Sequence, residues 1–154
     1  MQRRALLALL AAIPAAAQAQ TEPQPELPKE PLIIVTRDNK RHVFSVEMAL
    51  TPEQQTVGLM FRRTVPQDGG MLFDWGGVIT SRMWMRNTIS SLDMLFIAQN
   101  GTIHHIAERT IPQSLAIIDG GPARATIELA AGTAERLNIH VGDKVLQRIF
   151  NNAG

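Results

Sequence analysis

Apolar residues occur along this chain in short runs, most of which alternate with polar positions as residues of β-strands do. Residues 32–36 form a β-branched run, and the turn signal Asp38-Asn39 separates it from a second run over 42–50. Ser45 and Glu47 of the second run point to one face. By the same period-two rule, the alternate positions share the opposite face: His42, Phe44, Val46, Met48 and Leu50. The pattern predicts two successive strands.

The period changes at residue 51, where the sequence has the features of a helix start. Thr51 is a favourable N-cap, Pro52 suits the first helical position, and Gln54 lies three residues after the cap. We expect a short helix that ends near Gly58, and a further helical turn over residues 132–137.

The remaining apolar segments are also predicted to be strands, each bounded by glycine or another turn residue. The segment over 92–98 is apolar on both faces and is therefore placed centrally, and Asn100-Gly101 predicts a hairpin after it. Short strands with little helix predict a mostly β fold: a compact antiparallel sandwich or barrel, jelly-roll-like, with one or two short helices. The other predicted strands are one containing Phe73 and opened by Gly69-Gly70, and those over 82–87, 102–107, 125–130 and 144–150.

The first nineteen residues have the three parts of a cleavable secretory signal peptide. Arg3 and Arg4 supply the positive region, residues 5–17 are largely apolar, and the small residues at 17 and 19 predict a cut after Ala19. The apolar run is shorter than the roughly twenty residues of a membrane span. We expect a periplasmic or secreted protein with no membrane span after cleavage.

The segments on either side of this cut complete the domain organisation. Residues 2–7 resemble a relaxed twin-arginine export motif, which would carry the protein across the membrane already folded. Residues 20–31 hold four prolines and three glutamates with little to bury, so a linker that tethers rather than folds is predicted. Residues 32–151 are predicted to form a single β-rich domain.

Composition narrows the function mainly by what it excludes. The chain has no cysteine, so thiolate metal sites, a cysteine nucleophile, disulfides and a lipidated cysteine are excluded. Without Arg3 and Arg4, thirteen basic residues face fourteen acidic ones, with no long basic run. A nucleic-acid or anionic-membrane surface needs a concentrated positive patch, and we therefore expect no nucleic-acid partner.

Motif blocks spread through the domain are similar to those of one family. They occur over residues 51–55, 58–62, 68–73, 84–88, 92–94, 96–97, 128–129, 131–132 and 142–143. On these blocks the chain resembles the family of domains of unknown function numbered 192, small proteins that often carry an export signal or a membrane anchor. Arg86 stands where that family more often has lysine, and Met83 where it often has an aromatic residue. The resemblance covers about residues 43–145 and implies a compact, mostly β fold, without an activity, a cofactor or a catalytic residue.

The methionines form the first candidate site. Six of the seven lie between residues 48 and 94, and Met83 and Met85 share a predicted strand face. Thioethers select Cu(I), and four histidines are available beside them: His42, His104, His105 and His140. Methionine also fills irregular cores, and these residues lie on apolar strands. We favour core packing and therefore expect no cofactor. Met83 and Met85 are the candidate ligands for the alternative, a metal site.

Acidic residues inside apolar strands form the second candidate site. Asp93 interrupts the run over 92–98, and Glu128 lies between Ile127 and Leu129. A buried carboxylate needs a partner, and the candidates are Arg62, Arg86 and Asn87. Two carboxyl groups about 5–9 Å apart would suit hydrolysis of a glycosidic bond. A structural acid–arginine pair is the favoured interpretation.

Side chains that recognise polar ligands form the third candidate site. Arg62, Trp84, Arg86 and Asn87 offer guanidinium groups, an indole face and an amide. Strand alternation would point Trp84 and Arg86 one way and Asn87 the other, so the set lines one surface only if the strand bends. A tryptophan in the core with an arginine at its rim remains equally open.

Motifs of known enzymes are not found in the sequence. It has neither a G-x-S-x-G nucleophile elbow nor a phosphate-binding loop. The leading hypothesis is therefore a non-catalytic module of the cell envelope that binds a small molecule or an envelope protein. The alternatives are an envelope hydrolase that uses Asp93 and Glu128, and a copper protein that uses methionine and histidine.

Overall fold

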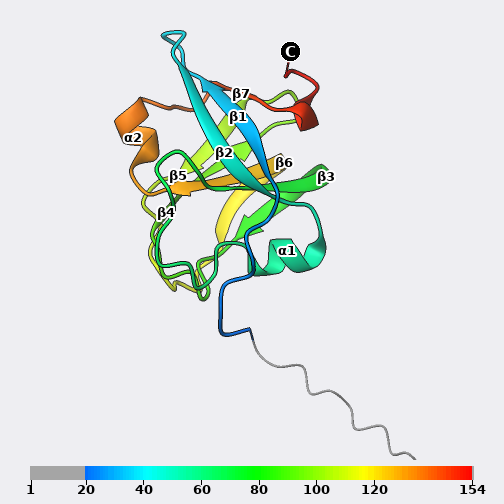
Figure 1. Ribbon diagram of the computed structural model, residues 1–154. Helices are drawn as coiled ribbons and strands as arrows, with labels where there is room; N and C mark the ends of the chain where they lie inside the picture. Colours follow the sequence, from blue (N-terminus) through cyan, green and yellow to red (C-terminus); the bar gives the residue numbers. More distant parts are fainter. Residues whose placement is uncertain (1–19, 154) are drawn as a thin grey trace, which may run out of the picture.

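Seven strands and two short helices make up the computed structural model, which describes residues 20–153 (Figure 1). The predicted signal peptide and its cut after Ala19 lie outside these residues. Within them, no helix is long and apolar enough to cross a membrane. The elements are β1 (Lys29–Val35), β2 (Arg41–Ala49), α1 (Pro52–Val57), β3 (Met71–Met83), β4 (Leu92–Ile97), β5 (Ile103–Ala107), β6 (Ile118–Ala130), α2 (Thr133–Leu137), β7 (Lys144–Leu146) and a 3₁₀ turn over Arg148–Phe150.

The strands form one sheet that closes into a barrel. Their order is β5-β4-β6-β3-β2-β1-β7, and a bridge between Thr102 and Lys144 joins the two ends. The Ile103 amide donates to the Asp143 carbonyl at 2.9 Å beside this bridge, so the sheet edges are paired instead of exposed. The prediction of a mostly β barrel or sandwich is confirmed. One detail differs: β2 and β3 pair in parallel, because the chain between them, which contains α1, crosses over before pairing.

Two hydrophobic cores lie on opposite faces of this sheet. The first core takes residues from all seven strands, such as Phe44, Leu72 and Ile127, and fills the barrel. The second lies on the outer face of β3, β4 and β6, where loop residues such as Leu59 and Met85 cover it. A barrel wall covered on both faces explains why every residue of β4 is buried.

The predicted helix start at residue 51 is confirmed in detail. The Thr51 hydroxyl accepts from the Gln54 amide at 3.3 Å, and the Gln54 side chain accepts from the Thr51 amide at 3.1 Å. This reciprocal capping satisfies amides that have no partner within the helix. The helix ends at Val57, and Gly58 follows with a φ of +49°, which suits glycine.

Two predicted strands differ from the structure. The predicted strand over 82–87 is wrong, because β3 runs on to Met83 and the chain then turns. Asn87 has a φ of +54°, a left-handed conformation that no strand can include. The last predicted strand, 144–150, stops at Leu146, because the Gln147 side chain accepts from the Ile149 amide at 2.9 Å and starts the 3₁₀ turn.

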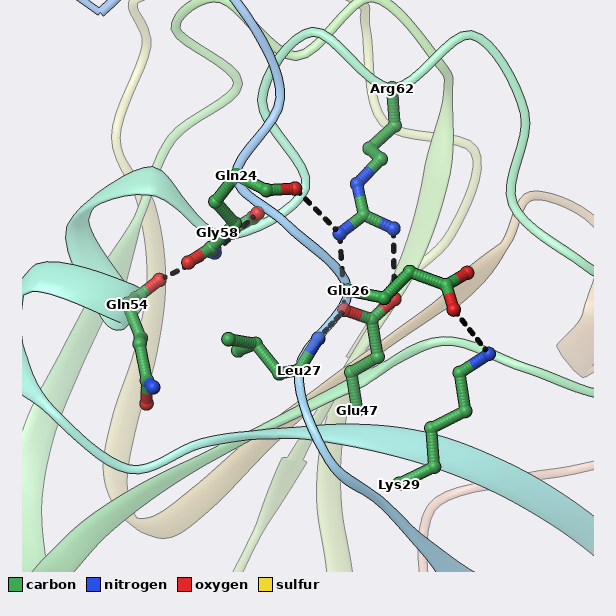
Figure 2. A network of polar contacts seen from close by, with 8 residues as sticks. All are labelled: Gln24, Glu26, Leu27, Lys29, Glu47, Gln54, Gly58 and Arg62. Atoms are coloured by element: carbon green, nitrogen blue, oxygen red, sulfur yellow. Dashed lines mark hydrogen bonds and ion pairs between the residues drawn. The ribbon is translucent and has the colours of Figure 1, made fainter.

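Residues 20–31 pack against the barrel instead of forming a free tether. The strand β1 already begins at Lys29. The Gln24 side-chain amide donates to the carbonyls of Gln54 and Gly58 at 3.0 and 2.9 Å, at the C-terminal end of α1. The composition of this segment suggested nothing to bury, whereas its polar groups satisfy backbone groups of the domain (Figure 2).

Asp93 holds one end of the barrel together through backbone amides. Its side chain is fully buried. One carboxylate oxygen accepts from the amides of Arg109 and Gly132 at 2.8 and 3.1 Å, and the other accepts from Ala134 at 2.9 Å. The carboxylate therefore caps the start of α2, which lacks a capping side chain of its own, and ties α2 to β4 and to the end of β5. This role differs from the predicted pairing with an arginine or with Asn87.

Replacing Asp93 should destabilise the whole domain. D93A leaves three amides, one of them buried, without an acceptor, and we expect a loss of about 3 kcal/mol in the free energy of unfolding, measured by urea denaturation. The exposed Glu108 serves as the control, since E108Q removes a carboxylate of the same region without breaking a contact. Equal stability of D93A and E108Q would contradict the capping role.

Candidate functional site

Two glutamates lie in one cross-strand row on the outer face of the sheet. The register pairs Glu47 of β2 with Met71 of β3, Met71 with Glu128 of β6, and Glu128 with Met94 of β4. Residues paired in this way point to the same face of a sheet. Since adjacent strands are about 4.8 Å apart, the backbones at the two glutamates are about 10 Å apart. The neighbours of these two carboxyl groups differ completely.

Glu47 is buried and fully paired. Both carboxylate oxygens accept from the Arg62 guanidinium, at 2.8 and 3.0 Å, and one also accepts from the Leu27 amide at 2.8 Å (Figure 2). Arg62 donates in addition to the Gln24 carbonyl at 3.3 Å. This bidentate pair lies in an open groove of about 850 Å³ between residues 21–29 and the loop over 61–70. Arg62 was predicted to pair with Asp93 or Glu128, and it pairs with Glu47 instead.

Glu128 is buried without a partner. Its side chain is 4% exposed, and no group among residues 20–153 hydrogen-bonds to its carboxyl. Burial alone raises the pKa of Glu128 to about 8, because the carboxylate has lost water and gained neither a donor nor a cation. Within residues 20–153, the fully enclosed side-chain atoms without a partner are His42 Nε2 and His104 Nε2, so the Glu128 oxygens, which are not among them, still reach open space.

The Glu128 carboxyl faces a pocket of about 210 Å³, which we call the Glu128 pocket. This volume equals about seven water molecules and suits a small ligand or one side chain. Aromatic rings, thioethers and a few polar groups line it. The lining residues are Gln55, Thr56, Val57, Gly58, Leu59, Met60, Phe73, Trp75, Arg82, Met83, Trp84, Thr88 and Glu128.

The aromatic walls of the pocket are held in place by contacts behind them. Trp75 stacks on Phe73 with ring centroids 5.6 Å apart, and its indole N–H donates to the Thr126 hydroxyl at 3.2 Å. Trp84 is 41% exposed, and the Arg86 guanidinium lies 5.3 Å from its ring centroid. Trp75 is therefore fixed by its contacts with Phe73 and Thr126, whereas Trp84 lies at the surface with the Arg86 cation against its ring.

The loops that carry Met60 and Trp84 meet in strained backbone. Phe61 and Asn87 have φ angles of +63° and +54°, and the Phe61 amide donates to the Asn87 carbonyl at 2.9 Å. A bulky residue such as phenylalanine adopts this conformation only when its surroundings require it. The hydrogen bond between Phe61 and Asn87 holds the two loops together beside the pocket.

The predicted site residues therefore separate into groups. Trp84, Glu128 and Met83 line the Glu128 pocket, and Arg86 stacks on Trp84. Arg62 lies in the other groove. Asn87 contributes backbone, and its side-chain amide lies 4.0 Å from the Met60 sulfur. Asp93 is structural.

The carboxylate pair proposed for a hydrolase is contradicted by the sheet register. Asp93 pairs with Leu129, a residue of the barrel core, whereas Glu128 pairs with Met94 of the outer core. The two side chains therefore project to opposite faces of the sheet. A glycosidase needs both carboxyl groups at one bond, so this pair cannot perform that reaction.

The copper site built on Met83 and Met85 gains no support from the structure. Met85 is completely buried in the outer core, and Met83 packs against the same core while it lines the pocket. No histidine lines the pocket. Among residues 20–153, no cluster of histidine and carboxylate side chains could hold a metal ion. The favoured interpretation, core packing, fits Met85 directly.

Sequence reasoning missed Glu47 and Trp75. Glu47 was predicted only to share a strand face with Ser45, and it is buried because residues 24–27 cross over it. Trp75 carried a usable signal, since it lies two residues after Phe73 in one strand and the period-two rule places both rings on one face.

The fold and the pocket define a small β-barrel domain with a ligand-sized pocket on its outer face. The chain belongs to the DUF192 family, described as an uncharacterized ACR, whose model matches residues 33–147. This confirms the resemblance seen in the motif blocks.

Two solved structures are similar to this chain. One is a Sinorhizobium meliloti 1021 protein described provisionally as a transcription regulator, with 42% identity and a TM-score of 0.79 over 82% of this chain and 98% of that one. The other is a Novosphingobium aromaticivorans DSM 12444 protein of unknown function, with 33% identity and a TM-score of 0.76 over 89% of this chain and 99% of that one. No curated protein matches the chain.

Glu128 should make the stability of the protein fall as the pH rises. In the unfolded chain its carboxyl ionises near pH 4.5, whereas in the folded protein it keeps its proton to about pH 8. Between these values the folded state binds more protons, so the free energy of unfolding decreases with pH, by on the order of 4 kcal/mol between pH 5 and pH 8. Urea denaturation at several pH values should show that E128Q removes this loss.

The exposed Glu53 of α1 provides the matched control, because E53Q should keep the pH dependence of the wild type. Identical pH profiles for wild type and E128Q would contradict an unpaired, buried carboxyl.

The Glu47–Arg62 pair should hold residues 20–28 on the barrel. E47Q leaves the Arg62 guanidinium with its charge unpaired, and we expect a loss of about 3 kcal/mol in stability together with earlier tryptic cleavage after Lys29. E26Q breaks the exposed Glu26–Lys29 pair of the same network and should change stability by less than about 0.5 kcal/mol. Mass spectrometry of timed digests compares the two variants, and similar cleavage rates would refute this role.

Proposed function

We propose that this chain is a non-catalytic binding module of the cell envelope, and that its ligand occupies the Glu128 pocket. The carboxyl of Glu128 carries the proposal, because it is almost fully buried, has no partner and faces a pocket with aromatic walls. A buried carboxyl group without a partner destabilises the folded protein. Such groups are typical of binding sites, where the ligand supplies the missing partner. The signal-peptide pattern over residues 1–19 supports the cellular location.

The chemistry of the lining supports binding over catalysis. Glu128 is the pocket's carboxyl group, and neither a serine nor a histidine lines the pocket beside it. Glu47, the next carboxyl in the same cross-strand row, is paired with Arg62 and separated from Glu128 by a strand. General acid–base catalysis usually needs a second positioned group, and such a group is missing from the lining.

A nucleic-acid role receives little support from the charges. One similar protein was described provisionally as a transcription regulator. Residues 20–154 of this chain carry thirteen basic and fourteen acidic residues without a long basic run. Affinity for nucleic acid depends largely on lysine and arginine contacts to phosphates, so a near-neutral domain favours other ligands.

A thermal-shift screen of small compounds, followed by calorimetry, tests the proposal. A ligand present at a hundred times its dissociation constant should raise the melting temperature of residues 20–154 by roughly 10 °C. W84A removes a surface wall of the pocket, and we expect at least about tenfold weaker binding of the same compounds. E53Q should bind as the wild type does.

Two outcomes would overturn the binding function. Compounds that bind wild type and W84A equally would place the site elsewhere. Chemical conversion of a bound compound, detected by mass spectrometry, would make the protein an enzyme.

A further inference from the structure

The walls of the Glu128 pocket select for the sign of a ligand's charge. Phe73, Trp75 and Trp84 bring three aromatic rings to its lining, together with the thioethers of Met60 and Met83. The face of an aromatic ring is electronegative, so it attracts cations and repels anions. Thioethers and rings also suit an apolar stem. The walls thus favour a ligand that is both cationic and partly apolar.

The uncharged amide and hydroxyl side chains of the lining already have partners. The side-chain amide of Gln55 donates to the carbonyls of Ala49 and Asp74, at 3.1 and 2.7 Å. The hydroxyl of Thr56 donates to the Pro52 carbonyl at 2.8 Å. These donors are therefore committed to the protein, and the carboxyl of Glu128 is the buried group of the lining that a ligand can satisfy, whereas Arg82 is exposed to solvent.

Thr88 is committed in the same way, since its hydroxyl donates to the Arg86 carbonyl at 3.3 Å. It lies on the loop that carries Trp84.

Charged groups on the surrounding elements leave Glu128 uncompensated. Arg82 of β3 lies exposed at the rim of the pocket, and Arg86 stacks on the outer tryptophan. Glu47 of β2 is neutralised by Arg62. The lining residues of α1 and of the loop after it, 55–60, carry no charge, and neither does Met94 opposite Glu128 on β4. A cation supplied from outside would thus meet an acid with no resident partner.

We propose that the ligand of the Glu128 pocket is an organic cation, a primary ammonium or guanidinium group on an apolar stem, which pairs with the Glu128 carboxylate. This inference rests on the proposed binding function. The cationic group donates to the carboxylate while the stem lies against the rings and thioethers. A free amine and a basic side chain of a polypeptide both present this chemistry.

Binding releases one proton. The carboxylic acid of Glu128 loses its proton to the buffer, and the ligand's cation takes its place beside the carboxylate. This acid keeps its proton to about pH 8. Below that value, each increase of one pH unit should therefore raise the affinity for a cation about tenfold, and above it the affinity should level off. A neutral ligand that accepts a hydrogen bond from the acid would keep its affinity below about pH 8 and lose it above that value.

Isothermal titration calorimetry with three matched probes tests the inference. 2-Phenylethylammonium, 3-phenylpropan-1-ol and 3-phenylpropanoate share an apolar body and differ in charge. The ammonium should bind residues 20–154 roughly fifty times more tightly at pH 8 than at pH 6. At pH 6, buffers of different ionisation enthalpy should report the release of about one proton.

Variants separate the carboxyl from the rest of the pocket. E128Q should bind the ammonium at least about tenfold more weakly than wild type at pH 8 and lose the pH dependence. This variant lacks the buried acid that destabilises the fold, so weak binding cannot be attributed to unfolding. E53Q should match the wild type in affinity and in pH dependence.

The probes also separate this inference from the binding function. Binding of the alcohol or the carboxylate as tightly as the ammonium, with loss in W84A, would keep the binding function and overturn the cation. A flat pH profile for the ammonium would overturn it as well. If none of the three probes and no compound of the screen binds, both proposals fail.

A second pair of probes identifies the source of the cation. One peptide carries lysine between two leucines, and the other carries norleucine in place of the lysine. Tighter binding of the lysine peptide than of the free ammonium would identify a polypeptide side chain as the ligand. Tighter binding of the free ammonium would identify a small amine. Equal binding of both peptides would overturn the cation.

Discussion

The bidentate ion pair between Glu47 and Arg62 connects the parts of the structure on which the pocket depends. It joins β2 to the crossover that follows α1, and through Gln24 and Leu27 it also fixes the N-terminal segment. The parallel pairing of β2 with β3 requires this crossover, and the crossover covers the outer face of the sheet. Because Glu47 uses both oxygens on this guanidinium, Arg62 is not available to Glu128, and the second carboxyl of the row remains unpaired.

An unpaired acid is tolerated here because it can keep its proton. Burying an ionised carboxylate in an apolar environment would cost far more than raising the pKa to about 8, which costs on the order of 4 kcal/mol at alkaline pH and little near pH 5. Binding sites commonly hold such locally unfavourable groups, at the expense of stability. The same loss of water that raises this pKa also strengthens any ion pair formed in the pocket.

Local features were predictable from the sequence, and long-range ones were not. The capping box at Thr51 and the hairpin turn at Asn100-Gly101 depend on a few neighbouring residues, and both occur as predicted. The partners of Asp93 lie 16 to 41 residues away, on segments whose approach only the closed sheet determines. The strand predicted over 82–87 failed for the same kind of reason, since Asn87 turns the chain where the loop at Phe61 meets it.

Several of the motif blocks that identify the family contribute side chains to the outer face of the sheet. If these blocks served only the barrel, their characteristic residues would point into its interior. Four blocks instead contribute to the pocket, whose lining includes Leu59 and Met60 (block 58–62), Phe73 (68–73), Trp84 (84–88) and Glu128 (128–129). Blocks far apart in the sequence thus converge on one small volume, which contains a buried acid and whose lining includes the exposed Arg82. A barrel alone does not need that arrangement, whereas a binding site does.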